Sequence, residues 1–137
     1  MKRLNLFVLL AAAVFALSAN AQPEELEPLD GSEPLVCDLV EAAECDGVAK
    51  CTDVTVEEIG LPPVWHVDFA ASQVASADAQ RTSPIAAVEV LDAVLVLQGH
   101  QAGHGWTMVI ERATGHLSAT ITGVEGAYVL AGACTTH

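Results

Sequence analysis

The chain has 137 residues, 52% of them hydrophobic, and carries eighteen acidic side chains against five Lys and Arg, a formal net charge of −13. This composition excludes a collagen-like or intrinsically disordered protein, because apolar residues are abundant and only ten positions are Gly. The acidic balance argues against nucleic acid as a partner, since nucleic-acid-binding proteins replace phosphate counterions with a basic face.

Residues 1–21 have the organisation of a secretory signal peptide. A Lys-Arg pair precedes an apolar run at 6–17, which is too short to span a bilayer, and Ala-Asn-Ala at 19–21 matches a signal-peptidase site. We therefore expect cleavage after Ala21 and export to the periplasm. The first cysteine is Cys37, well beyond that point, so we expect no lipid anchor.

An acidic leader precedes the folded part of the mature chain. Residues 22–34 contain Pro, Gly and five acids with only two leucines, a composition typical of disorder. From residue 35 the pattern changes, and residues 35–137 are expected to form a single β domain. Alternating apolar and polar residues predict strands at 35–40, 64–69, 85–90, 94–98, 106–111, 117–122 and 127–134.

The connections between these segments differ in their turn signals. Residues 53–58 fit either a short strand or a turn of helix, and the Ala- and Ser-rich residues 73–80 are typical of a polar connection. Residues 91–93 lack Gly, which favours a longer loop over a two-residue primed turn. The glycine-rich residues 99–105 predict a flexible hairpin loop, and Gly115 is expected to adopt the left-handed conformation in a tight turn.

Short strands joined by brief turns predict an all-β fold, a small antiparallel meander of about six to seven strands. Such a sheet must bury one face and protect its edges. A closed, barrel-like sheet achieves both, and a curled or two-layered sheet is the alternative.

Four cysteines in an exported chain predict two disulfides. Three pairings are possible. The spacing favours Cys45 with Cys51, which enclose a five-residue loop containing a Gly, and Cys37 with Cys134, which lie near the two ends of the domain. The second bond closes a loop of about a hundred residues, worth about 4–5 kcal/mol by chain entropy. The spacing does not match the paired knuckles of a zinc fold.

Several segments resemble a family of small exported bacterial proteins of unknown function. The most specific are the Trp-Thr-Met-Val-Ile strand at 106–110 and the Gly-Ala-Cys-Thr ending at 132–135, and the four-cysteine pattern also fits. Further matching pieces are the segments at 61–62, 81–85, 97–99 and 114–115. The chain departs from the family pattern at 92–93, where Asp-Gly is expected, and at 131–132, where Phe-Gly is expected. The resemblance implies a fold and a compartment but no activity.

Chemical motifs are sparse. His100 and His104 share one glycine-rich loop and are weak candidates for a metal site, since imidazole binds zinc and copper well. A third ligand is not identifiable, and two solvated histidines are the simpler interpretation. No nucleophile motif such as G-x-S-x-G and no H-E-x-x-H or phosphate loop is present. We therefore expect no cofactor, and an enzyme is the less favoured class.

The charge distribution is the most distinctive surface property. Thirteen of the eighteen acids lie between residues 22 and 68, alongside Lys50 as the only cation there. Such a field attracts cationic partners. We therefore predict a periplasmic, disulfide-stabilised binding or structural protein that engages a cationic protein or peptide, with an inhibitor as one concrete form. The alternative is a His-based metal-binding or small hydrolytic protein. Arg81, beside a predicted strand, is expected to pair with Asp68 or Asp92.

Overall fold

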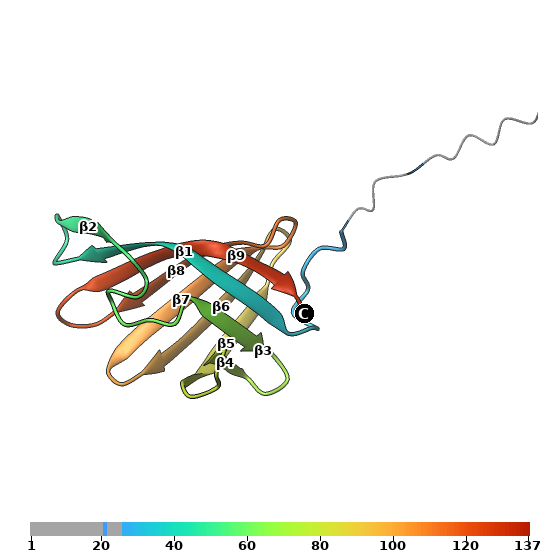
Figure 1. Cartoon of the computed structure of the whole chain (residues 1–137). Helices are drawn as coiled ribbons and strands as arrows, with labels where there is room; N and C mark the ends of the chain where they lie inside the picture. The colour runs from blue at the N-terminus through green and yellow to red at the C-terminus, as the bar shows by residue number, and fades with distance from the viewer. Residues whose placement is uncertain (1–20, 22–25) are drawn as a thin grey trace, which may run out of the picture.

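The computed structural model describes residue 21 and residues 26–137; the rest of the predicted signal peptide and residues 22–25 of the leader lie outside the described residues. The described part is all-β and contains no helix, as predicted (Figure 1). It has nine strands, two or three more than expected: β1 (Leu35–Cys45), β2 (Cys51–Val54), β3 (Val64–Asp68), β4 (Gln73–Ser76), β5 (Thr82–Val90), β6 (Val94–Gln101), β7 (His104–Glu111), β8 (His116–Thr122) and β9 (Ala127–Thr136).

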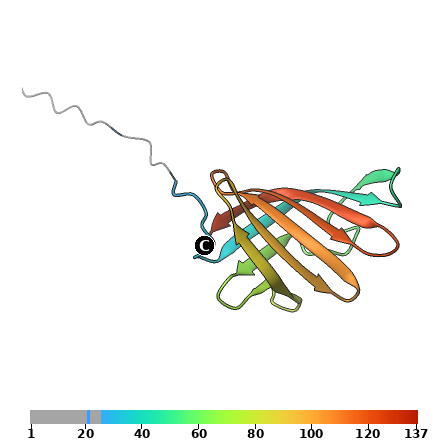
Figure 2. The same cartoon turned by 180° about the vertical axis from the view of Figure 1, so that it is seen from behind.

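Eight of the strands close into an antiparallel barrel. From β3 to β9 each strand pairs with the next along the chain, and β1 completes the ring by pairing with both β9 and β3. β1 is long enough to share one edge between two partners, β3 at Leu35–Asp38 and β2 at Ala42–Cys45. β2 is therefore an extra strand outside the ring. The predicted closed barrel is the observed arrangement (Figures 1 and 2).

A β-bulge explains why β1 is longer than its alternation predicts. The register with β9 shifts between Leu39 and Glu41, which places one extra residue on β1. Leu39 and Ala42 are both buried although their spacing is odd, while Val40 between them is 72% exposed. The simple period of two fails at this point, so the expected strand ended at residue 40.

The interior of the barrel is lined by side chains that alternate along the strands, and their buried members form the core. Val56, which lies between β2 and β3, adds to this core from outside the ring. The buried core comprises Leu35, Cys37, Leu39, Ala42, Val56, Trp65, Val67, Ile85, Leu95, Leu97, Met108, Ile110, Leu117, Ala119, Leu130 and Cys134.

Two predictions about connections were wrong. Residues 73–80 are not simply a polar connection, because their first four residues form β4 and pair with β3 and β5. Residues 99–105 do form the predicted hairpin, but five of the seven belong to β6 and β7 rather than to a flexible loop. β6 and β7 pair up to Gln101 and His104 and are joined by Ala102 and Gly103 alone, both with positive φ (50° and 81°), the conformation that a primed two-residue turn requires.

Other turns have the conformations that the sequence predicts. Gly115 has a φ of 76°, as expected. The connection 91–93 is three residues long and none of its residues has a positive φ, which fits the expectation for a turn without Gly. Residues 55–60 form a single turn in which Thr55 and Glu58 bond reciprocally: the Thr55 N–H donates to Oε2 of Glu58 at 2.7 Å, and the Glu58 N–H donates to Oγ1 of Thr55 at 3.2 Å.

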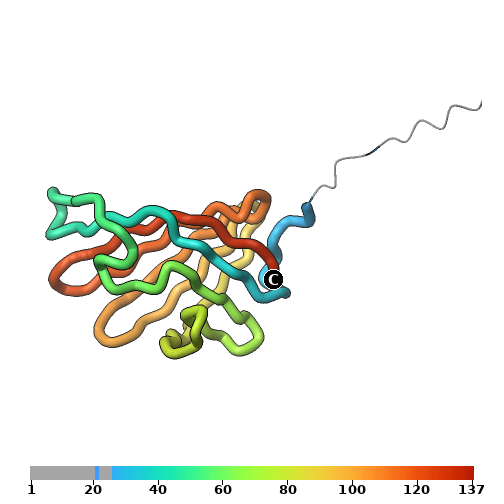
Figure 3. The backbone as a smooth tube through the Cα atoms, viewed as in Figure 1, coloured from blue at the N-terminus to red at the C-terminus, as the bar shows by residue number. Residues whose placement is uncertain are grey.

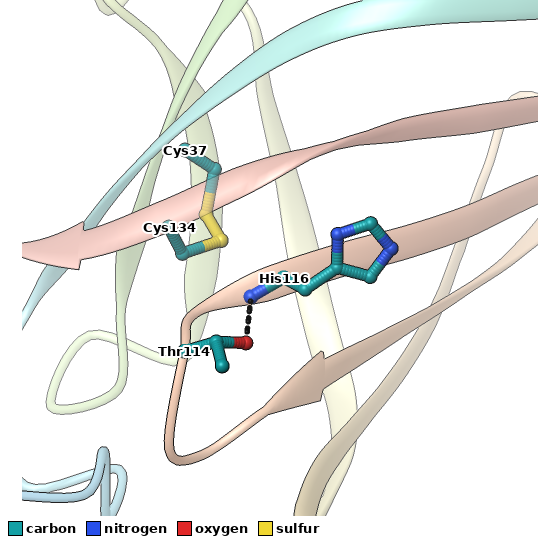
Figure 4. The surroundings of a disulfide bond; sticks show 4 residues. All are labelled: Cys37, Thr114, His116 and Cys134. Carbon is teal, nitrogen blue, oxygen red and sulfur yellow. Dashed lines mark hydrogen bonds between the residues drawn. A yellow bond between two sulfur atoms is a disulfide. The ribbon is translucent and has the colours of Figure 1, made fainter.

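The disulfides adopt the pairing that the spacing favours. Cys37 is bonded to Cys134 across β1 and β9, and Cys45 is bonded to Cys51 across β1 and β2. The Cys37–Cys134 bond lies inside the barrel next to the start of β8, where the His116 N–H donates to Oγ1 of Thr114 at 3.1 Å (Figure 4). It ties the first strand of the ring to the last.

The two ends of the barrel are covered differently. At the end that carries both the start of β1 and the chain's C-terminus, residues 26–34 pack back on the barrel. The Leu29 N–H donates to the Arg112 carbonyl at 2.9 Å, and the Arg112 Nε donates to the Leu29 carbonyl at 2.6 Å. At the other end, the segment between β2 and β3 (green in Figure 3) lies beside β1, where the Leu39 N–H donates to the Pro63 carbonyl at 2.8 Å.

Candidate functional site

A pocket of about 500 Å³ opens at the end of the barrel opposite the C-terminus. We call it the mouth pocket. Its walls come from six consecutive strands, β3 to β8, together with the segment before β3 and the hairpin after β4. Its lining includes Leu61, Pro62, Trp65, Ser76, Gln80, Arg81, Ser83, Gln101, His104, Trp106, Met108, Ala119 and Ile121.

Trp106 forms one wall of the mouth pocket. It lies opposite Gly99 of β6, and a Cβ built on Gly99 would lie 2.3 Å from Cζ2 of the indole. The absent side chain lets the ring lie flat across β6 and reach β5, where its Nε1 donates to Oγ of Ser83 at 2.8 Å. Trp106 is half-buried, so one part of the indole faces the pocket.

The floor of the pocket is apolar and belongs to the barrel core. Trp65, Met108 and Ala119 are buried core residues, and Ile121 packs against the same core while remaining partly exposed. Leu61 and Pro62 close the side formed by the segment before β3. Indole, thioether and aliphatic groups therefore surround the deepest part of the hollow.

The hairpin between β4 and β5 supplies the polar side of the mouth. Its anchor is Ser76, whose hydroxyl donates to Oδ1 of Asp78 and accepts the Arg81 N–H at 3.1 Å. The Gln80 N–H also donates to Oδ1 of Asp78, at 3.0 Å. The Ser76 hydroxyl, followed by the Gln80 N–H, lowers the pKa of Asp78 below its ordinary value of 3.8. The ionised carboxylate thus holds the hairpin in shape.

Arg81 is the only residue with a permanent positive charge among those that line the mouth pocket. Its Nη1 donates to the Gly60 carbonyl at 2.6 Å, which fixes the guanidinium against the segment before β3. The expected pairing with Asp68 or Asp92 was wrong, because both acids lie at the opposite end of the barrel, at the end of β3 and after β5. The carboxylate whose pKa Arg81 helps to lower is that of Asp78 in its own hairpin.

The two candidate metal-binding histidines do not converge. His104 pairs with Gln101 and His100 pairs with Gly105, so their side chains leave the sheet on opposite faces. His104 lines the mouth pocket, where its Nδ1 lies 3.1 Å from the Ala102 carbonyl oxygen, and His100 lies on the outer face. Within residue 21 and residues 26–137, no group of three or more His, Cys, Asp or Glu side chains is arranged to hold a metal ion.

A second, more polar hollow of about 570 Å³ lies beside the mouth pocket, between the Cys45–Cys51 hairpin and residues 123–128. Its charged lining consists of Glu44, Asp46 and Glu125 with Lys50. It shares Ala102 and His104 with the mouth pocket. The acidic N-terminal half of the sequence therefore contributes to this end of the barrel, next to the apolar cavity.

Sequence reasoning missed the mouth pocket because its residues are spread from 61 to 121, and His104 is the only one of them that the sequence marked as a candidate ligand. One local signal was available. Gly99 and Trp106 stand at equivalent distances from the turn at 102–103, and a Gly opposite a large aromatic residue in a hairpin indicates that the ring lies over the neighbouring strand.

No helix in the described part of the chain is both long and apolar enough to cross a membrane. Comparison with known proteins adds no relative: no family model, no curated protein and no solved structure matches the chain. The resemblance to exported proteins of unknown function stays a prediction.

Proposed function

We propose that the protein is an exported, non-catalytic binding protein that holds a small amphipathic molecule in the mouth pocket. The observation that carries the proposal is a cavity of about 500 Å³ with an apolar floor and a polar rim at the end of a closed eight-stranded barrel. Barrels of this size have room for one small ligand when side chains do not fill the interior completely.

The lining supports a specific chemistry for the ligand. Its apolar body would lie against Trp65, Trp106 and Met108. Its polar end would carry negative charge or a strong hydrogen-bond acceptor, because Arg81 and Gln80 stand at the rim. Arg81 is notable here because the chain as a whole has a net charge of −13.

A binding role fits the hydrogen bonds made by the two serine hydroxyls of the pocket. The Ser83 Oγ accepts the Trp106 indole N–H at 2.8 Å, and the Ser76 hydroxyl donates to the Asp78 carboxylate. Both hydroxyls orient the walls, and neither has a strong base beside it. The Ser83 Oγ accepts an indole N–H, and the Ser76 hydroxyl lowers the pKa of the Asp78 carboxylate, which makes that carboxylate a weak base. Export to the periplasm is part of the proposal and is supported by the signal-peptide pattern and by disulfides that fit an oxidising compartment.

The experiment is a calorimetric titration with three probes that share one phenyl body and differ in their polar end: 3-phenylpropionate, its neutral amide and the corresponding cationic amine. We expect the carboxylate to bind best, with a Kd on the order of 0.1–1 mM for a molecule this small. The amide should bind more weakly, and the amine most weakly.

Two variants test whether the mouth pocket causes this order of affinities. Arg81→Gln should weaken carboxylate binding by about tenfold and remove its advantage over the amide, since one charge-assisted hydrogen bond is lost. Lys50→Gln removes the same charge from the neighbouring hollow and should leave the order unchanged. Equal affinity for the three probes, or the same loss in both variants, would refute the proposed ligand class.

A further inference from the structure

β5 has an open edge at the end of the barrel away from the mouth pocket. β4 pairs only with residues 82–84 of β5, and the Ile85 N–H makes one further bond, to the Ser72 carbonyl at 2.8 Å. Residue 86 is a bulge in the pairing with β6. From Ala87 to Val90, β5 pairs with β6 on one side and with no strand of the described chain on the other. Figure 2 shows β5 continuing past the short strands β3 and β4.

The hydrogen-bonding pattern shows which backbone groups face this edge. The Leu91 N–H donates to the Val94 carbonyl of the β6 side at 2.9 Å. Backbone groups in an antiparallel ladder point to alternate sides. The N–H and C=O groups of Glu89 therefore face β6, and those of Val88 and Val90 face the open edge.

The side chains at the edge are apolar and incompletely covered. Val88 and Val90 pair with Leu97 and Leu95, so they share the inward face of the sheet with two fully buried leucines. Val88 is nevertheless 41% exposed and Val90 is 52% exposed. They are missing the strand that would cover them from the β4 side.

The negative charge around the open edge favours a positively charged partner. Glu89 lies on β5 itself, Asp92 follows directly in the turn, and Asp68 ends β3 at the same end of the barrel. A second copy of this chain would bring another net charge of −13 to the same edge. An extended segment with positive side chains would meet no such repulsion and would bring its charges next to Glu89.

We propose that the open edge of β5, residues 86–90, is a docking strand for an extended cationic segment of a partner protein. The segment adds to the sheet by antiparallel or parallel backbone pairing with Val88 and Val90, covers their side chains and places its own cations near Glu89 and Asp92. This site is separate from the mouth pocket and does not depend on the small ligand.

The test is hydrogen exchange measured by NMR, with the full disulfide-bonded protein and an eight-residue capped peptide in which lysine alternates with valine. We expect the peptide to slow exchange of the Val88 and Val90 amides at least fivefold and to leave the Ser76 and Trp106 amides unchanged. A peptide with glutamate in place of each lysine should have no effect at the same concentration.

Three variants make the test specific. Val88→Pro removes an N–H that faces the open edge, and an edge strand tolerates Pro at such a position. This variant should reduce the affinity for the peptide at least tenfold. Glu89→Lys changes a side chain on the outer face of the sheet and should not affect folding. It should reduce the affinity for the peptide at least threefold. Glu125→Lys makes the same charge change at the other end of the barrel and should have no effect.

The proposal is overturned if the peptide protects residues 123–128 rather than β5. It is also overturned if Glu89→Lys and Glu125→Lys reduce the affinity for the peptide equally, because binding would then depend on net charge alone. Dimerisation through β5 in the absence of peptide, seen as slowed exchange at Val88 that rises with protein concentration, would replace the cationic partner with a second copy.

Discussion

The indole of Trp106 on β7 reaches over β6 and donates to Ser83 on β5, with an Nε1–Oγ distance of 2.8 Å. One side chain thereby joins two strands that are not neighbours in the barrel. The bond fixes the ring that forms one wall of the mouth pocket, and it is possible because Gly99 leaves the space beneath the ring empty.

Gly99→Ala should disrupt this arrangement. The new Cβ would lie 2.3 Å from the indole and 2.4 Å from the Pro84 carbonyl oxygen, so both the ring and the backbone would have to move. We expect a loss of about 1–3 kcal/mol in the free energy of unfolding, measured by urea denaturation. Gly105→Ala is the matched control, because its Cβ meets nothing within 4 Å, and it should change stability by less than about 0.5 kcal/mol. Equal losses in the two variants would contradict the packing argument.

The sequence predicted the elements whose side chains alternate without interruption. β3, β7 and β8 lie within two residues of their expected bounds, because each buries every second side chain against the core. β4 was missed because it has four residues, and its Ala and Ser side chains give no strong apolar alternation. The mouth pocket was not predictable because it depends on how six strands curve together, which no local spacing records.

The two disulfides should differ in their contribution to stability. Cys37 and Cys134 are 97 residues apart, whereas Cys45 and Cys51 are six apart. By loop-closure entropy, replacing the first pair with Ala should cost about 4–5 kcal/mol and replacing the second about 2 kcal/mol. Denaturant unfolding of the two double variants measures both values. A larger loss from the Cys45/Cys51 pair would show that the barrel does not depend on the bond between its first and last strands.

Arg112 should hold residues 26–34 against the barrel. Its guanidinium donates to the Leu29 carbonyl at 2.6 Å and to the Leu91 and Asp92 carbonyls at 3.0 and 3.2 Å. In Arg112→Met we expect amide exchange at Leu29 to accelerate at least tenfold, because bonds from a charged donor are each worth about 1.5–3 kcal/mol. Exchange at Leu117, deep in β8, should be unchanged. Continued protection of Leu29 would mean that its apolar contacts and the backbone bond from its N–H to the carbonyl of residue 112 anchor the segment without the guanidinium.

Acidification should loosen the hairpin that carries Arg81. The pKa of Asp78 is lowered in the folded protein by the Ser76 hydroxyl and the Gln80 N–H. Its stabilising contribution is therefore complete above the ordinary pKa of 3.8 and is lost as the pH falls through the lowered folded value. Asp78→Asn should be less stable than the wild type near neutral pH, and this difference should shrink below pH 3.8. Thermal unfolding across this range measures it, and a difference that stays constant with pH would contradict the assignment.

Ser76→Ala is a second test of the Asp78 carboxylate. Removing the hydroxyl removes the largest cause of the shift and should move the pKa of Asp78 back toward 3.8. Carbon-detected NMR titration of the Asp78 carboxyl carbon reports this directly. An unchanged titration midpoint would mean that the Gln80 N–H alone holds the carboxylate.

The most direct test of the account follows the two indole N–H signals and the backbone amides by ¹H–¹⁵N NMR while 3-phenylpropionate is added. If the ligand binds at the barrel mouth, the signals of the Trp106 indole and of the Ser76, Ser83 and Gln101 amides shift saturably, and those of the Val88 and Val90 amides do not shift. Shifts confined to other surfaces, or none at millimolar probe, would contradict a ligand site at the barrel mouth.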